Sequence, residues 1–224
     1  MSTLSNLKSQ PITGKQRISQ FGEEMTCLSD IYKEQVNMAV WQRSLSASLQ
    51  QAAKQLIQLN PTLVWTEVVT PDRIHDRIMD QFSDVDNITF LADDIFQLVD
   101  LFCCLFELSQ AGLRFSVLDR AMCPRFHVDK VPCRLITTYC GIATQWLPQH
   151  LVDRTKLGAG CSGKTDEDSG LMLKANAIQQ LEVGQVALLK GENWLNNQNA
   201  GLVHRSPQPG EGEQRLLLTL DFAD

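Results

Sequence analysis

The chain changes character near Gly112, where segments with helical periodicity give way to short segments of alternating side chains. Before that point, residues 44–59 and 88–110 carry apolar side chains three and four positions apart, which predicts helices with one buried face. Pro71 opens a third amphipathic segment, since proline favours the first helical turn. Residues 36–41 are predicted to form a short strand. We therefore predict a mainly helical N-terminal region over residues 16–111, preceded by a flexible, Ser- and Gln-rich tail of residues 1–15.

The second half of the chain alternates instead, as strands with one buried face do. The segments with this pattern are residues 113–119, 134–140, 186–190, 201–205 and 215–222. Clusters of turn-forming residues separate them, above all residues 158–170 and 207–212. The sequence therefore predicts a domain of short strands over residues 112–224. The expected fold class is α+β, with the helical region packed on the β domain.

Charge and composition narrow the classes of partner. Residues 1–111 hold 8 Lys and Arg against 14 Asp and Glu, whereas residues 112–224 hold 12 of each, so the net charge of −6 belongs to the first half. No basic stripe for nucleic acid is visible. The longest apolar run, residues 96–108, is interrupted by polar residues and is shorter than the roughly 20 residues of a membrane span. An odd number of cysteines, without a CxxC pair, indicates reduced thiols. We expect a cytoplasmic protein without nucleic-acid or membrane partners.

Two of the four histidines fall in a pattern typical of a metal site. His127 and Asp129 are two apart on a predicted strand, so their side chains point to the same side. His204 is the histidine of a later strand-like segment and can supply the third ligand. Two imidazoles and one carboxylate on one face suit a non-haem iron(II) site, and they do not exclude zinc. The alternative is that the three side chains only hydrogen-bond to one another inside a barrel.

Arg215 follows His204 and opens the last predicted strand. Alternation places it on one face with Leu217, Thr219 and Asp221, while the other face is apolar. An arginine on the inner face of a barrel is costly unless it meets an anion. A guanidinium–carboxylate pair with two hydrogen bonds would satisfy it.

Together, His127-Val128-Asp129, His204 and Arg215 resemble the signature of the iron(II)- and 2-oxoglutarate-dependent oxygenases. The fold of that family is a double-stranded β-helix, which is a jelly-roll or cupin-like barrel. Residues 134–139 and 181–189 resemble the strands that follow the first ligand pair and precede the second histidine. Over the whole chain, the segments 123–129, 146–148 and 204–207 resemble a bacterial family named domain of unknown function 1826, whose members often lie beside genes of metal homeostasis.

The resemblance implies a dioxygenase that hydroxylates a substrate with iron(II) and 2-oxoglutarate. The triad would hold the metal, and Arg215 would bind the distal carboxylate of 2-oxoglutarate, helped by a hydroxyl group of Tyr139 or Thr219. Two alternatives stay open. One is a non-catalytic protein that handles zinc through the same triad, and the other is an interaction protein whose helical region, residues 16–111, binds a partner.

The substrate is only hinted at. We expect a small-molecule or anionic substrate. Arg125, Arg134 and Arg205 lie close in sequence to the proposed ligands and suggest an anion, although charges beside strands are usually just solvated. Trp194 is a candidate for the pocket wall, and packing in the core explains it equally well. The glycine-rich segment 153–170 is predicted to be either a lid over the barrel or a plain surface loop.

Overall fold

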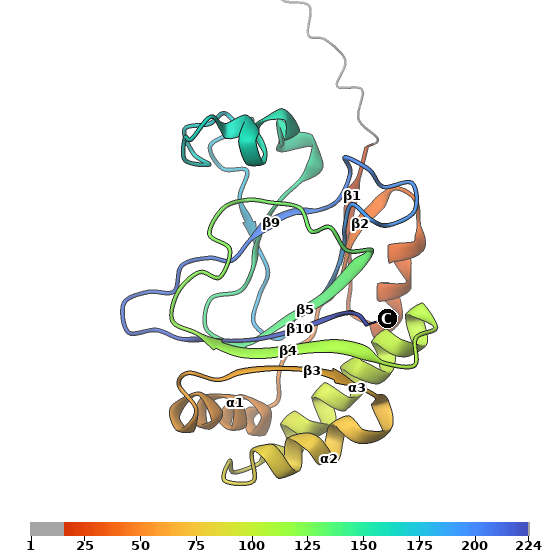
Figure 1. Cartoon of the computed structure of the whole chain (residues 1–224), viewed down its shortest axis with the longest axis vertical. Helices are drawn as coiled ribbons and strands as arrows, with labels where there is room; N and C mark the ends of the chain where they lie inside the picture. The colour runs from red at the N-terminus through yellow and green to blue at the C-terminus, as the bar shows by residue number, and fades with distance from the viewer. Residues whose placement is uncertain (1–15, 224) are drawn as a thin grey trace, which may run out of the picture.

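The computed structural model describes residues 16–223, so the tail predicted for residues 1–15 lies outside the described residues. Within these residues, three α-helices, four 3₁₀ helices, of which η1 (Met25–Tyr32) lies between β1 and β2, and two sheets make up the fold, and the predicted α+β class is confirmed (Figure 1). The main sheet has the order β1-β2-β8-β5-β10-β4-β3, and the small sheet has the order β7-β6-β9. The helices are α1 (Ala47–Leu59), α2 (Pro71–Gln81) and α3 (Ile88–Phe106). The main-sheet strands are β1 (Ile18–Gly22), β2 (Val36–Trp41), β3 (Val64–Val69), β4 (Ala111–Leu118), β5 (Cys133–Cys140), β8 (Val186–Lys190) and β10 (Arg215–Phe222), and the small-sheet strands are β6 (Gln145–Leu147), β7 (Gln179–Gln180) and β9 (Val203–Arg205).

The three helices begin and end where local chemistry favours it. The Ser46 hydroxyl accepts a hydrogen bond from the Leu49 backbone N–H and caps α1. Pro71 occupies the first turn of α2. α3 ends at Phe106, and the left-handed backbone of the next residue, Glu107, lets the Leu108 N–H reach the Cys103 carbonyl. Within residues 16–223, no helix combines the length and the apolarity that a membrane crossing requires.

Strands from both halves of the chain share the main sheet. β2 pairs with β8, and β3 pairs with β4, so the predicted helical region is joined to the β domain by backbone hydrogen bonds. The prediction for residues 36–41 matches β2, but β1 and β3 were not predicted. In β3, the exposed positions Val64 and Val68 are apolar, like the half-buried Trp65. The sequence therefore lacks the alternation of apolar and polar residues that predicts a strand. β3 lies at an edge of the sheet, where a strand needs only one buried face.

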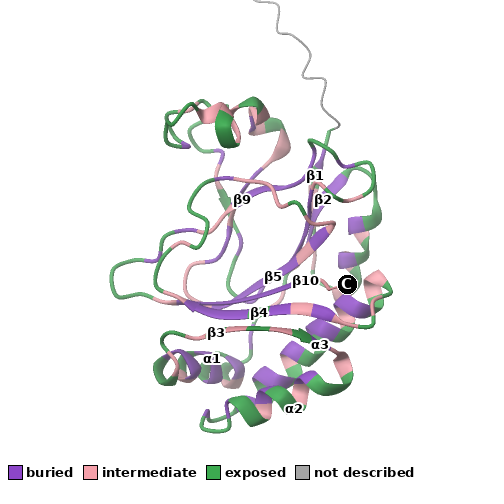
Figure 2. Ribbon diagram, viewed as in Figure 1, coloured by how far each residue is buried: buried purple, intermediate pink, exposed green. Residues whose placement is uncertain are grey.

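The buried apolar residues of the described chain form three clusters. Figure 2 shows the buried positions along the main-sheet strands and on parts of the helices. The first lies between the three helices and one face of the main sheet, and includes Leu216, Leu218 and Leu220 of β10. The second lies between the two sheets and includes Leu217 and Trp146. Alternation along β10 therefore sends one set of side chains to the helices and the other to the space between the sheets.

The third cluster lies beneath the segment of residues 149–178, which we call the outer lobe. The outer lobe contains three 3₁₀ helices, η2 (Gln149–Leu151), η3 (Arg154–Lys156) and η4 (Gly158–Cys161). Val152, Leu171 and Ala177 of the lobe pack with Leu147 of β6 and Val203 of β9. The segment predicted as a lid or plain loop thus belongs to a small folded unit with its own core, seen above β9 in Figure 1.

Gly191, directly after β8, packs against the backbone of the segment that carries the candidate ligand Asp129. A Cβ at Gly191 would lie 2.1 Å from the Val131 carbonyl oxygen and 2.8 Å from that of Asp129. We expect Gly191→Ala to lower the free energy of unfolding by about 1–3 kcal/mol, because the 129–131 backbone must move. Gly112→Ala is the matched control, since its Cβ would meet nothing closer than 3.6 Å. Urea unfolding of both variants checks this, and equal stabilities would contradict it.

Candidate metal centre

The backbone brings His127 and His204 together. The two residues form an isolated antiparallel bridge in which each backbone N–H donates to the other's carbonyl oxygen at 3.0 Å. On β9, His204 is paired with Trp146 of β6, and the neighbouring Val203 is paired with Leu147. Trp146 faces the space between the sheets and Leu147 faces the outer lobe. His204 therefore lies on the inner side of the small sheet, because neighbouring side chains on a strand alternate.

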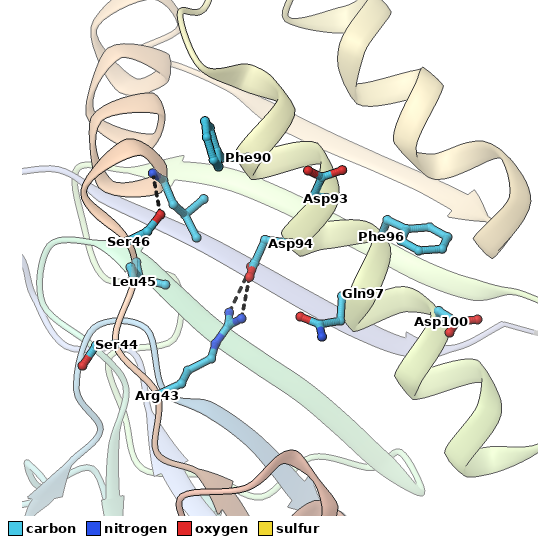
Figure 3. Close-up of a pocket in the computed structure, with 11 residues that line it drawn as sticks. Arg43, Ser44, Leu45, Ser46, Phe90, Asp93, Asp94, Phe96, Gln97 and Asp100 are labelled. Atoms are coloured by element: carbon cyan, nitrogen blue, oxygen red, sulfur yellow. Dashed lines mark hydrogen bonds and ion pairs between the residues drawn. The ribbon is translucent and has the colours of Figure 1, made fainter.

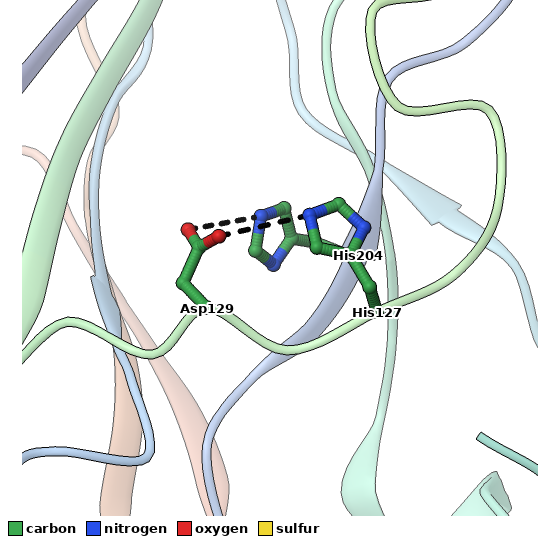
Figure 4. A group of neighbouring side chains, drawn as sticks. All are labelled: His127, Asp129 and His204. Carbon is green, nitrogen blue, oxygen red and sulfur yellow. Dashed lines mark ion pairs between the residues drawn. The ribbon is translucent and has the colours of Figure 1, made fainter. Parts of the chain in front are cut away.

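Asp129 completes a compact triad with the two histidines (Figure 4). Its carboxylate oxygens lie 3.6 Å from His127 Nε2 and 3.4 Å from His204 Nε2, and one ligand atom from each residue lies within 4.8 Å of the others. Ligands about 2.1 Å from one metal ion are separated by roughly 3 Å at octahedral or tetrahedral angles. The three residues therefore fit a divalent metal ion.

The histidine rings are held in the orientation that a metal needs. Nδ1 of His127 lies 2.9 Å from the Arg125 carbonyl oxygen, and Nδ1 of His204 lies 3.2 Å from the Leu202 carbonyl oxygen. A carbonyl only accepts, so each Nδ1 is the protonated nitrogen in the neutral ring. Each Nε2 therefore faces Asp129, where it interacts with the carboxylate when it carries a proton and can offer its lone pair to a metal ion when it does not.

Asp129 is kept ionised by its surroundings. Burial alone would raise its pKa, but hydrogen bonds to His127 and His204 and the charge of Arg134 hold the pKa well below its usual range. The hydrogen bond with Asp129 in turn raises the pKa of His127. Arg134 Nη1 donates to Asp129 at 2.8 Å, and the rest of its guanidinium forms two 2.8 Å hydrogen bonds with Asp221. Arg134 is thus held by Asp221 and orients the carboxylate of Asp129.

Arg215 is buried without a counter-ion among the described residues. Its side chain is 1% exposed, and it donates to the hydroxyls of Ser206, Thr138 and Thr144 at 3.1, 3.1 and 2.6 Å. Its Nε has no hydrogen-bond partner within residues 16–223, and burial lowers the pKa of the Arg215 guanidinium to about 10. Arg215 is still protonated at neutral pH. A buried cation compensated only by hydroxyl groups is a natural site for an anion.

The two hydroxyl residues proposed beside Arg215 lie on different faces of the main sheet. Thr219 is on the same face as Arg215, two same-face positions further along β10. Tyr139 is not at the site: the register between β5 and β10 passes from Thr138 to Cys140, as at a β-bulge, and the ring packs in the helical core. Its hydroxyl donates to Asp94 at 2.7 Å.

Asp94 also pairs with Arg43 beside a cavity of about 530 Å³ between α1 and α3 (Figure 3). That cavity is lined by residues of the helical face and by none of the triad. The sequence offered a signal for Tyr139, because counting in twos from Arg134 reaches Thr138 and not Tyr139.

The arginines proposed to contact substrate are already paired. Arg125 and Arg205 both bind Asp166 of the outer lobe, and Arg134 binds Asp129 and Asp221. The ring of Trp194 packs against Tyr32 and Phe106, away from the triad. The positive charge near the ligands is thus largely neutralised within the protein, and it lends less support to an anionic substrate than the sequence suggested.

Other residues of the site were missed in the sequence. Thr138, Thr144 and Ser206 surround Arg215. The two-residue period of β5 points to Thr138, but no single spacing links all three, because they come from separate segments. Asp166 was missed because it lies in a polar, glycine-rich stretch, where an acidic residue is expected to be solvated. In the structure it is 4% exposed.

The fold is thus α+β, and a His-Asp-His triad lies between its two sheets. Residues 22–221 match the family described as "Protein of unknown function (DUF1826)". The match spans most of the chain, so the protein belongs to this family. No curated protein sequence matches the chain.

Several solved structures are similar in fold. They include a rice dioxygenase for auxin oxidation (9% identity, TM-score 0.47, 83% of this chain and 72% of that chain). A prolyl-4-hydroxylase of Pseudomonas putida (11%, 0.45, 88% and 96%) is also similar. A third is HygX of Streptomyces hygroscopicus with nickel and 2-oxoglutarate bound (9%, 0.42, 89% and 86%). At these values the likeness carries no argument about function, which must come from the side chains.

Arg134 provides a test of the triad that leaves all three ligands in place. We expect Arg134→Gln to weaken Co(II) binding by about 10–100-fold, because Asp129 loses the group that orients it. Calorimetric titration of the metal-free protein measures this. Arg114→Gln is the control, since Arg114 is exposed and its hydrogen bond goes to the Met122 sulfur. Wild-type affinity in folded Arg134→Gln would show that Asp129 needs no such support.

Proposed function

We propose that this protein is an iron(II)- and 2-oxoglutarate-dependent oxygenase that hydroxylates a small-molecule substrate. The two facing sheets are then a double-stranded β-helix, with the triad of His127, Asp129 and His204 at its inner surface. The single observation that carries the proposal is Arg215, a buried, charged guanidinium that lacks an acidic partner in the described chain and has an unpaired Nε.

The position of Arg215 relative to the triad supports a short dicarboxylate as the anion. Ser206, which accepts from Arg215, follows His204 by two residues, and Thr144 precedes Trp146, the partner of His204, by two. Two residues along an extended chain span roughly 6.6 Å. A five-carbon 2-oxo diacid can therefore chelate a metal at the triad with one end and reach the guanidinium with the other.

Each residue then has a distinct part in the reaction. His127, Asp129 and His204 would hold the metal on one face and leave the remaining positions for the co-substrate and oxygen. Iron(II) and 2-oxoglutarate would together supply the oxidising chemistry, in which one atom of O2 enters a substrate C–H bond as a hydroxyl group and the other enters succinate as 2-oxoglutarate loses carbon dioxide. Arg215 binds and orients the co-substrate, and Thr219 lies on the same face of β10. Leu217 and Trp146, in the cluster between the sheets, limit the access of water.

The alternative of a zinc-handling protein without turnover is less well supported. The triad alone suits zinc as well as iron(II). A protein that only holds a metal ion gains nothing from a buried arginine without a counter-ion, since such a charge destabilises the fold. Co-substrate binding accounts for both the triad and Arg215.

Succinate formation tests the proposal. We expect the protein, reconstituted with iron(II) under anaerobic conditions and then exposed to oxygen, to form succinate from 2-oxoglutarate. His127→Ala should abolish this by removing a metal ligand. Arg215→Met should bind Co(II) as the wild type does but bind 2-oxoglutarate at least about tenfold more weakly, since a charged hydrogen bond contributes about 1.5–3 kcal/mol.

The same variants provide the control and the contrary result. Arg215→Met should be folded at least as stably as the wild type, because replacing a buried, unpaired charge by an apolar side chain is often neutral or stabilising. Thermal unfolding monitors this. Equal 2-oxoglutarate affinity in Arg215→Met and wild type, or no succinate above the His127→Ala background across a panel of candidate substrates, would leave metal binding without oxygenase turnover.

A further inference from the structure

Asp166 of the outer lobe is a buried carboxylate shared by the two segments that carry the metal ligands. It lies between Lys164 and Asp168 in a polar stretch of the lobe, yet it is 4% exposed. Its Oδ1 accepts from Arg125 Nε at 2.8 Å. Its Oδ2 accepts from the Phe126 backbone N–H at 2.8 Å and lies 3.4 Å from Arg205 Nη1. Phe126 immediately precedes His127, and Arg205 immediately follows His204.

One of these contacts leads directly to a metal ligand. The N–H of Phe126 and the carbonyl of Arg125 belong to the same planar peptide group. That carbonyl oxygen accepts the hydrogen bond from Nδ1 of His127, at 2.9 Å. Asp166 thus holds one side of a rigid unit whose other side holds the imidazole of His127. Hydrogen bonds in such a chain polarise one another, so the carboxylate also strengthens the carbonyl as an acceptor.

The packing around Asp166 holds the same segments in place. The Arg205 guanidinium lies 4.4 Å from the centre of the Phe126 ring, and its Nε donates to Gln145. Phe126 and Val203, which point away from the triad, are buried in the core of the outer lobe. The outer lobe therefore packs against both metal-bearing segments on the side away from the triad, and Asp166 supplies the negative charge at that contact.

We propose that Asp166 is a positioning residue, which orients the imidazole of His127 through the Arg125–Phe126 peptide and fixes the two metal-bearing segments against each other. The proposal rests on the metal centre of the proposed function. In this proposal the outer lobe helps to fix the geometry of the metal site. It differs from the sequence expectation that residues 153–170 form a lid over the barrel. A carboxylate can be buried at this position because Arg125 and Arg205 both pair with it.

Two substitutions of Asp166 separate the peptide contact from the charge. In Asp166→Asn, the amide oxygen can still accept from the Phe126 N–H, but the ion pairs with Arg125 and Arg205 are lost. In Asp166→Ala, both are lost. Glu167→Gln is the matched control, because Glu167 also pairs with Arg205, at 3.1 Å, but its side chain is 56% exposed and does not contact the peptide.

Co(II) is the probe, added to the metal-free full-length protein, with affinity measured by calorimetry and ligand geometry by the visible spectrum of the bound ion. We expect Asp166→Ala to bind Co(II) about 10–100-fold more weakly and with an altered spectrum. Asp166→Asn should fall between Asp166→Ala and wild type, and Glu167→Gln should match the wild type. A merely structural role would lower the melting temperature without changing the spectrum of the bound ion.

The outcomes distinguish this proposal from the proposed function. Wild-type Co(II) affinity and spectrum in Asp166→Ala would overturn the positioning role, and equal losses in Asp166→Asn and Asp166→Ala would overturn the peptide route. If Asp166→Ala does not fold, Asp166→Asn against Glu167→Gln still decides, since wild-type behaviour of Asp166→Asn in both readouts would overturn the proposal. Wild-type Co(II) binding by His127→Ala would instead remove the metal centre itself, whereas absent succinate formation would leave the Asp166 result intact.

Discussion

The antiparallel backbone pairing of His127 with His204 is the interaction on which the rest of the site depends. Two hydrogen bonds of 3.0 Å join residues that lie far apart in the sequence and bring their rings to 4.6 Å between centres. Alternation along the paired segments then sends the ligands inward and Val203 outward, into the core of the outer lobe. A slip of one residue would exchange these faces and dismantle the triad.

Around that pairing, the charged side chains fall into two kinds. Most arginines near the ligands are matched with carboxylates: Arg134 with Asp129 and Asp221, and Arg125 and Arg205 with Asp166. These pairs orient backbone and ligand atoms and leave little free charge. Arg215 differs, because its partners in the described chain are hydroxyl groups and its Nε has none. The contrast between matched and unmatched guanidinium groups separates structural arginines from the one placed to bind an anion.

Much of the β domain could be predicted because strand alternation is a local property. The segments predicted at residues 186–190 and 215–222 have the bounds of β8 and β10, and the predicted inner face of β10 carries Arg215, Leu217 and Thr219 as expected. β1 and β3 were missed because edge strands need little burial and show weak patterns. Tyr139 was proposed from the family resemblance alone, whereas the two-residue period of β5 already places it on the same face as Leu135, in the helical core.

By itself, the sequence determined the ligand types and the presence of a cation on the inner face of the last strand, which follow from residue chemistry and from the two-residue period of a strand. His127 and Asp129 do point to one place, but the strand predicted to carry both is absent from the described residues, where His127 forms only an isolated bridge. Only the tertiary structure decided which charges are neutralised, that Asp166 supports His127 through a peptide group, and that Arg215 is left among hydroxyls. Those properties depend on contacts between distant segments, which no local pattern encodes.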